Sequence, residues 1–239
     1  MPGKVGIIES DASASYDLKL FGKLPLLISS GINHIEINKA VPVDLPDHLI
    51  GFANDIDMIL PYFDIDKTYI DLGISPSFLS DDWSFEAQTF RMPMRSFLIY
   101  QPDEKLTFLY GVAVYPYFIT EVLPILGFIY KPNERLTFDI VPDNPNITYV
   151  LNDKVMIFAE GGYNLNNEFI VTRNGSKNVA LSYENLHIGG GLEFKLNKSI
   201  ECSFSTGGIF DHSLEYSDEA GKVNIDKCFY MQFEIEIKS

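Results

Sequence analysis

Apolar and polar residues alternate with a period of two along most of the chain. Between residues 228 and 237 every odd position is bulky and apolar, and the even positions are polar or small. The same alternation runs through residues 105–116 and 179–196. A period of two is typical of β-strands that present one apolar face. The pattern therefore predicts an all-β protein.

A repeated turn sequence organises these strands. The segment YQPDEKLTF from Tyr100 to Phe108 recurs as YKPNERLTF from Tyr130 to Phe138, 30 residues later. Weaker copies, with Asp or Asn followed by a basic residue, begin at Tyr62, Tyr149 and Phe194. Proline, aspartate and asparagine favour tight turns because they fix φ or hydrogen-bond to the local backbone. The spacing fits two strands per repeat, so we expect all of these turns at one end of a sheet.

The pattern predicts a single antiparallel barrel of about twelve strands in residues 16–239. Residues 1–15 are expected to form a tail or a plug in the lumen. Both chain ends would then lie at the end that carries the tight turns. The predicted strands are 16–38, 49–62, 67–78, 84–100, 105–116, 120–130, 135–141, 147–151, 154–172, 179–196, 200–216 and 224–238. An even number of antiparallel strands with short periplasmic turns is the layout of a transmembrane barrel in a bacterial outer membrane.

The strands of a soluble sandwich or barrel would also show alternating apolar and polar residues. Long strands and aromatic residues beside the turns favour the membrane, where aromatic girdles mark the interfaces. The same aromatic residues would also brace hairpins through cross-strand pairs in a soluble protein. The N-terminal sequence lacks the basic and apolar regions of a signal peptide, so we expect a signal to have been removed from an exported chain.

Composition narrows the classes of partner. Lysine and arginine number 18 and aspartate and glutamate 33, giving a net charge of −15 that disfavours nucleic acid. The two cysteines, Cys202 and Cys228, exclude a disulfide framework. The alternation places the two cysteines on opposite faces of the sheet. If Phe210 pairs with Phe229, Cys202 lies opposite Ile237 and far along the strand from Cys228. We therefore expect both thiols to be free.

The sequence predicts no catalytic, metal or cofactor site. None of the four histidines has a second histidine or a cysteine at the spacing of metal ligands. The segment Asp211-His212-Ser213 alone hints at acyl chemistry. Adjacent residues of a strand point to opposite faces, so His212 and Ser213 do not form a nucleophile–base pair.

Charged residues on three consecutive predicted strands suggest a cluster in the lumen. Asp55 and Asp57 lie on one face of the second predicted strand, Asp71 on the third, and Arg91 and Arg95 on the fourth. Consecutive strands are usually neighbours, and barrel interiors are polar. We expect the arginines to pair with the aspartates and to brace the wall. Scattered polar residues lining water are the alternative.

The chain also resembles an uncharacterised family of bacterial outer-membrane β-barrels. The resemblance rests on the segments GISPSF from Gly73, LPILGFIYKPNERLTF from Leu123, YVLND from Tyr149 and GGGLEF from Gly189, and it covers about residues 24–238. These segments are turns and strands, so the resemblance implies a fold and a location but no activity. The chain departs from many such barrels by ending on Glu-Ile-Lys-Ser instead of an aromatic residue.

Together these features predict an outer-membrane barrel, in contact with membrane lipids, that has a structural or passive transport role. Twelve strands fall between filled small barrels and open porins, so a narrow or plugged lumen is expected. A soluble barrel that binds a small apolar ligand is one alternative, and an outer-membrane lipid hydrolase is another. The sequence identifies no protein partner.

Overall fold

The computed structural model of the protein is all-β, and sixteen strands form one sheet. It describes residues 5–20, 24–39, 44–62, 65–83, 85–116, 121–142, 145–173, 176–197, 200–217 and 222–237. The strands are β1 (Val5–Leu20), β2 (Leu24–Lys39), β3 (His48–Pro61), β4 (Thr68–Ile74), β5 (Ser77–Ser80), β6 (Phe90–Arg91), β7 (Met94–Tyr100), β8 (Leu106–Val114), β9 (Val122–Tyr130), β10 (Leu136–Ile140), β11 (Asn146–Asn152), β12 (Val155–Arg173), β13 (Ser176–Lys195), β14 (Ile200–Tyr216), β15 (Lys222–Ile225) and β16 (Cys228–Ile237).

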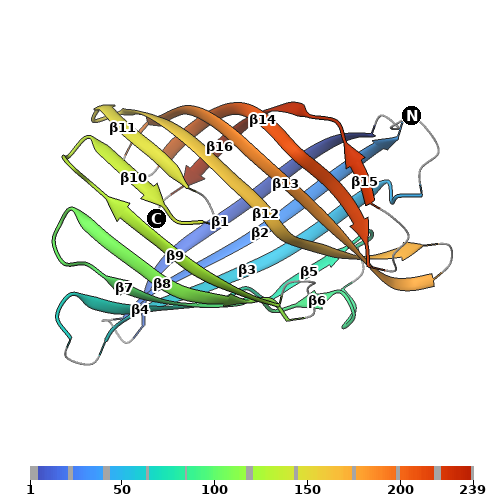
Figure 1. Ribbon diagram of the computed structural model, residues 1–239, viewed down its shortest axis with the longest axis horizontal. Coiled ribbons are helices and arrows are strands. Elements are labelled where there is room, and N and C mark those ends of the chain that lie inside the picture. Colours follow the sequence, from blue (N-terminus) through green and yellow to red (C-terminus); the bar gives the residue numbers. More distant parts are fainter. Residues whose placement is uncertain are drawn as a thin grey trace.

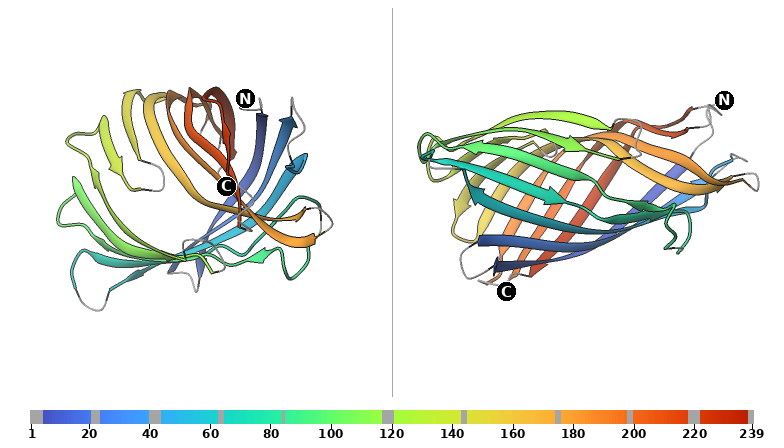
Figure 2. Two further views of the ribbon diagram at one scale, coloured as in Figure 1. Left: turned by 45° about the vertical axis from the view of Figure 1, so that its right-hand side comes forward. Right: turned by 90° about the horizontal axis from the view of Figure 1, so that it is seen from below.

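The sheet forms an eleven-strand closed barrel with extra strands, which confirms the predicted all-β barrel but not the predicted even number of about twelve strands. The strands run obliquely along the long axis of the molecule (Figures 1 and 2). Neighbours along the path from β1 to β15 pair antiparallel, mostly in sequence order. The described part of the chain contains no helix long and apolar enough to cross a membrane.

The N-terminal segment is a strand of the wall. Strand β1 pairs with β2 along its whole length, from Val5 opposite Lys39 to Leu20 opposite Leu24. The prediction of a tail or plug is therefore wrong for residues 5–15, and so is the prediction of one strand over 16–38; residues 1–4 lie outside the described residues. Alanine, serine and aspartate dilute the apolar alternation of β1, and this hides it in the sequence. As a result, β1 begins at the end of the barrel opposite to the one where β16 ends (Figure 1), so the prediction that both chain ends lie at the end with the tight turns is wrong.

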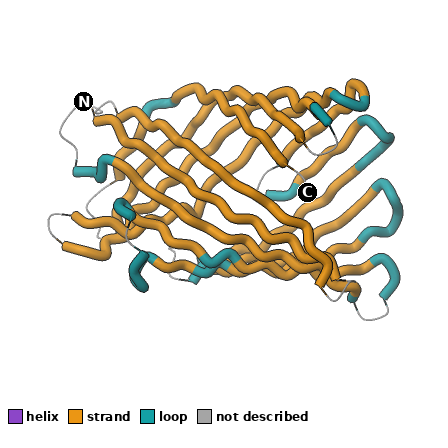
Figure 3. The backbone as a smooth tube through the Cα atoms, turned by 180° about the vertical axis from the view of Figure 1, so that it is seen from behind, coloured by secondary structure: helices purple, strands orange, loops and turns teal. Residues whose placement is uncertain are grey.

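The repeated sequence forms the same tight turn twice. Asp103 Oδ1 accepts hydrogen bonds from the backbone N–H groups of Lys105 and Leu106, at 2.8 and 3.0 Å. Asn133 Oδ1 accepts the equivalent bonds from Arg135 and Leu136, at 2.9 and 3.1 Å. These turns lie at one end of the barrel, as predicted (Figure 3). We call this the tight-turn end and the other the loop end.

Prolines divide two of the predicted strands. Pro76 separates β4 from β5, and Pro93 separates β6 from β7. Strand β5 pairs with β3, and a single parallel bridge joins its Ser80 to Ile170 of β12. At the loop end the wall therefore passes from β3 through β5 to β12, whereas at the tight-turn end it includes β4 and β7–β11. The ring is smaller at the loop end.

Both cysteines are free, as predicted. The expected register of the last strand is wrong by two residues, since Phe229 lies opposite Gly208 and Cys202 opposite Ile235. A bulge in β14 interrupts its pairing with β13 but leaves its register with β15 and β16 unchanged. Glu184 pairs with Ser213 and Leu186 with Phe210, so two steps on β13 correspond to three on β14. Asp211, inside the bulge, has a positive φ of 46°.

Candidate functional site

Apolar side chains fill the lumen at the loop end. They come from strands on different sides of the ring, such as β2, β12 and β14, which meet only in the interior of a barrel. Several enter as pairs two residues apart, as Phe169 and Val171 do, because alternate residues of a strand share a face. We call this buried cluster the plug; its members are Val5, Ile35, Ile37, Leu45, Leu49, Phe169, Val171, Leu181, Tyr183, Leu214, Tyr216 and Ile225.

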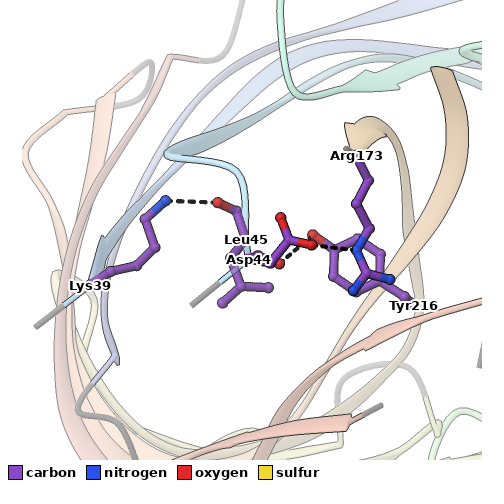
Figure 4. Close-up of polar contacts among 5 residues, drawn as sticks. All are labelled: Lys39, Asp44, Leu45, Arg173 and Tyr216. Carbon is purple, nitrogen blue, oxygen red and sulfur yellow. Dashed lines mark hydrogen bonds and ion pairs between the residues drawn. The ribbon is translucent and has the colours of Figure 1, made fainter. Parts of the chain in front are cut away.

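Residues 44–47, here called the strap, lie against the plug inside the ring (Figure 4). Leu45 belongs to the apolar cluster. Arg173 Nε donates to Asp44 Oδ2 at 2.7 Å, and the Arg173 guanidinium carbon lies 4.1 Å from the centroid of the Tyr216 ring. The Tyr216 hydroxyl donates to the Asp44 carbonyl oxygen at 2.9 Å. The strap is thus held to β12 and β14, across the ring from β2.

Lys39 holds the other side of the strap. Its Nζ donates to the Leu45 carbonyl oxygen at 2.7 Å and lies 2.6 Å from Asp47 Oδ1. The Lys39 ammonium lowers the pKa of the exposed Asp47 carboxyl, so this pair is charged at neutral pH and is lost only under acid conditions. Among the described residues, wall side chains and the strap therefore occupy the loop end of the lumen.

Part of the predicted charge cluster forms at the tight-turn half of the lumen. Arg95 Nη2 lies 2.7 Å from Asp57 Oδ1. Gly73 of β4 is opposite both Asp57 and Arg95, so the ion pair spans an intervening strand. A Cβ atom at Gly73 would collide with both side chains, and the glycine is what allows them to meet. Asp71 lies near the pair, and its buried Oδ1 has no hydrogen-bond partner among the described residues.

Arg91 does not belong to this cluster, which corrects the prediction. Its Nη2 lies 3.7 Å from Glu168 Oε1, and both side chains are buried. Its Nη1 donates to the carbonyl oxygens of Gln88 and Phe90, at 2.9 and 3.0 Å. The break at Pro93 carries β6 away from β7 and toward β12. Asp55 is opposite Ser29 and shares a face with Asp57, but no ion pair joins it to the described residues.

We expect Arg95→Ala to lower the free energy of unfolding by about 1–3 kcal/mol, because Asp57 would lose its charged partner in a half-buried site. The measurement is urea unfolding of the protein in detergent. Arg135→Ala is the control, since the exposed Arg135 contributes its backbone N–H to a turn, and a change within about 0.5 kcal/mol is expected. If both variants changed the free energy of unfolding equally, the ion pair of Arg95 with Asp57 would not brace the wall.

The histidines do not assemble a catalytic or metal centre within the described ranges. His212 lies opposite Ile225 and Ser213 opposite Asn224, so the two side chains project to opposite faces, as predicted. The rings of His34 and His48 stack with centroids 6.0 Å apart. Sequence spacing misses this contact because it arises from the pairing of β2 with β3. The described residues hold no group of three or more metal-ligating side chains.

Comparison with known proteins gives one family. Residues 81–236, more than half of the chain, match the family model of a domain of unknown function, DUF6268. No curated protein matches the chain.

Proposed function

The chain belongs to the DUF6268 family, a domain of unknown function, and we propose that it is a bacterial outer-membrane β-barrel with a closed lumen and a structural or narrow passive-transport role. The observation that carries the proposal is the apolar outer face of the barrel. Phe229 and Met231 of β16 are 92% and 79% exposed, and Leu126 of β9 is 68% exposed.

These exposed side chains form rows across neighbouring strands. Phe204 lies opposite Leu192 on one side and Phe233 on the other, and all three are exposed. Tyr110 lies likewise between Leu98 and Leu126. A soluble monomer rarely exposes contiguous apolar patches beyond about 300–600 Å². Contact with lipid removes the need to shield such a face from water.

Aromatic residues mark the tight-turn end of this face. Tyr100, Tyr130, Tyr149 and Phe194 are exposed next to their turns. The ring of Tyr130 stacks on Phe138 with centroids 6.3 Å apart. Such a band matches the interfacial girdle of an outer-membrane barrel, with the tight turns toward the periplasm.

The plug and the strap determine the role that we propose. They close the loop end, so passage of solute requires the strap or the plug side chains to move. A soluble barrel for an apolar ligand would place its polar face outward, the reverse of the arrangement in β14 and β16. The lipid hydrolase alternative finds no support in His212 and Ser213, because their side chains project to opposite faces.

Detergent dependence tests the proposal. The chain is expressed behind a bacterial export signal, extracted from the outer-membrane fraction and purified in detergent. We expect the folded protein to migrate differently from the heated protein in a gel and to aggregate when detergent is removed. A monodisperse monomer in plain buffer would contradict the membrane assignment.

A further inference from the structure

The first and last strands of the barrel meet at an irregular seam. Among the described residues β1 pairs only with β2, and β16 pairs only with β14, although β1 and β16 approach each other. Val5 is opposite Lys39 at the loop end, so β1 runs toward the tight-turn end. Strand β16 is antiparallel to β14 and runs the same way (Figures 1 and 2). The seam therefore joins two parallel strands, unlike the antiparallel neighbours elsewhere along the path.

A cavity of about 850 Å³ lies at this seam. Its inner wall includes Glu9, Asp11, Tyr183 and His212, and its outer wall includes Phe229 and Met231. The inner residues belong to the lumen, whereas the two residues of β16 are the most exposed apolar side chains of the barrel. One end of the cavity is thus polar and the other apolar.

The charges around the seam cavity are acidic. Glu9, Asp11 and Glu234 line it, and its lining contains no lysine or arginine. Asn33 Nδ2 donates both to Glu9 Oε1 at 2.8 Å and to Asp11 Oδ1 at 2.5 Å. The amide thereby holds two carboxylates close together, and no cation is paired with either of them among the described residues. Like charges held together favour a bound cation.

A buried histidine adds an independent observation. His212 is only 3% exposed, and neither Nδ1 nor Nε2 has a hydrogen-bond partner in the described part of the chain. Its ring packs edge-on against Tyr183, with centroids 5.2 Å apart, at the inner wall of the cavity. Buried polar atoms without partners destabilise the folded state, so a polar group bound here would relieve that cost.

We propose that the seam cavity binds a cationic amphiphile of the alkylammonium class. This inference rests on the proposed membrane function. The ammonium head lies against Glu9 and Asp11 and hydrogen-bonds to His212, and the alkyl chain leaves the barrel between β1 and β16 along Phe229 and Met231. The seam then connects the lumen laterally with the lipid phase, below the closed loop end.

The native Cys228, which lines the cavity, reports on this site. The protein with Cys202→Ser is placed in phosphatidylcholine nanodiscs, and labelling of Cys228 by a maleimide is followed by mass spectrometry. We expect dodecylammonium to slow labelling at least about tenfold, as a site that concentrates cations would, and dodecanoate to have little effect. Glu9→Gln with Asp11→Asn should abolish the protection, whereas Asp17→Asn, on the same strand but outside the cavity, should retain it.

A second measurement needs no change in the acidic residues. The reaction rate of Cys228 is measured with two methanethiosulfonates, one carrying a trimethylammonium group and one carrying a sulfonate group. Each rate is divided by the rate of the same reagent with a free thiol. The cationic reagent should then react at least about tenfold faster. Equal protection by dodecylammonium and dodecanoate, or equal normalised rates, would overturn the seam site alone. A protein that stays soluble and does not enter nanodiscs would overturn the membrane function and the seam site with it.

Discussion

Replacing Phe169 with alanine is expected to lower the free energy of unfolding by about 3–5 kcal/mol, the usual cost of deleting a fully buried aromatic side chain. Phe169 lies in the plug opposite Leu181 of β13, and both are almost completely buried. The cavity left behind would lie within the plug. We therefore also expect the variant to conduct ions in a planar bilayer more than the wild-type protein does.

Phe158→Ala is the matched control for this prediction. Phe158 is on the same strand, β12, but it is only partly buried and lies outside the plug. Its replacement should cost less stability and leave conductance unchanged. Equal conductance of the two variants would show that the plug does not close the lumen.

Replacing Phe204 with arginine is expected to destabilise the protein in lipid by more than about 1 kcal/mol, because a cation on the lipid face must leave water at a cost that rises from about 0–1 kcal/mol near the interfaces to about 2–4 kcal/mol at the bilayer midplane. In a soluble barrel the same change at an exposed position would stay within about 0.5 kcal/mol. Reversible urea unfolding in liposomes measures the difference.

Ser203→Arg provides the control on the neighbouring residue. Ser203 faces the lumen and lies opposite Glu193 and Glu234, so a new arginine would meet carboxylates. We expect little loss of stability for this variant. If Phe204→Arg were as well tolerated as Ser203→Arg, the outer face would not be in contact with lipid.

Local patterns made much of the fold predictable. The tight turns follow from aspartate and asparagine side chains that bind their own backbone, and Asp103 and Asn133 do so in the structure. The ion pair of Arg95 with Asp57 follows from alternation on consecutive strands. The turns depend on residues close in sequence, and the ion pair depends on residues of neighbouring hairpins that share one face, which period-two patterns capture.

Features that depend on distant segments were not predictable. Strand β1 has a weak apolar pattern and is stabilised by its full-length partner β2. Alternation does not predict the position of Arg91, because Pro93 interrupts the strand and the partner of Arg91, Glu168, lies far away in sequence. The strap contacts join Asp44 to Arg173 and Tyr216, which no local period connects. The two-residue offset of the last strand keeps every side chain on its expected face, so alternation does not reveal it.

Tryptophan fluorescence can show whether the outer face of the barrel contacts lipid. Trp83 is the single tryptophan, so Trp83→Phe gives a silent background. On β4, Leu72→Trp would face outward and Tyr69→Trp would face the lumen, and the native side chains are similarly exposed, at 39% and 38%. In liposomes containing brominated lipids, we predict quenching of the tryptophan at position 72, and quenching of the tryptophan at position 69 by aqueous iodide alone. Quenching of both by iodide, with no effect of bromine, would contradict the account.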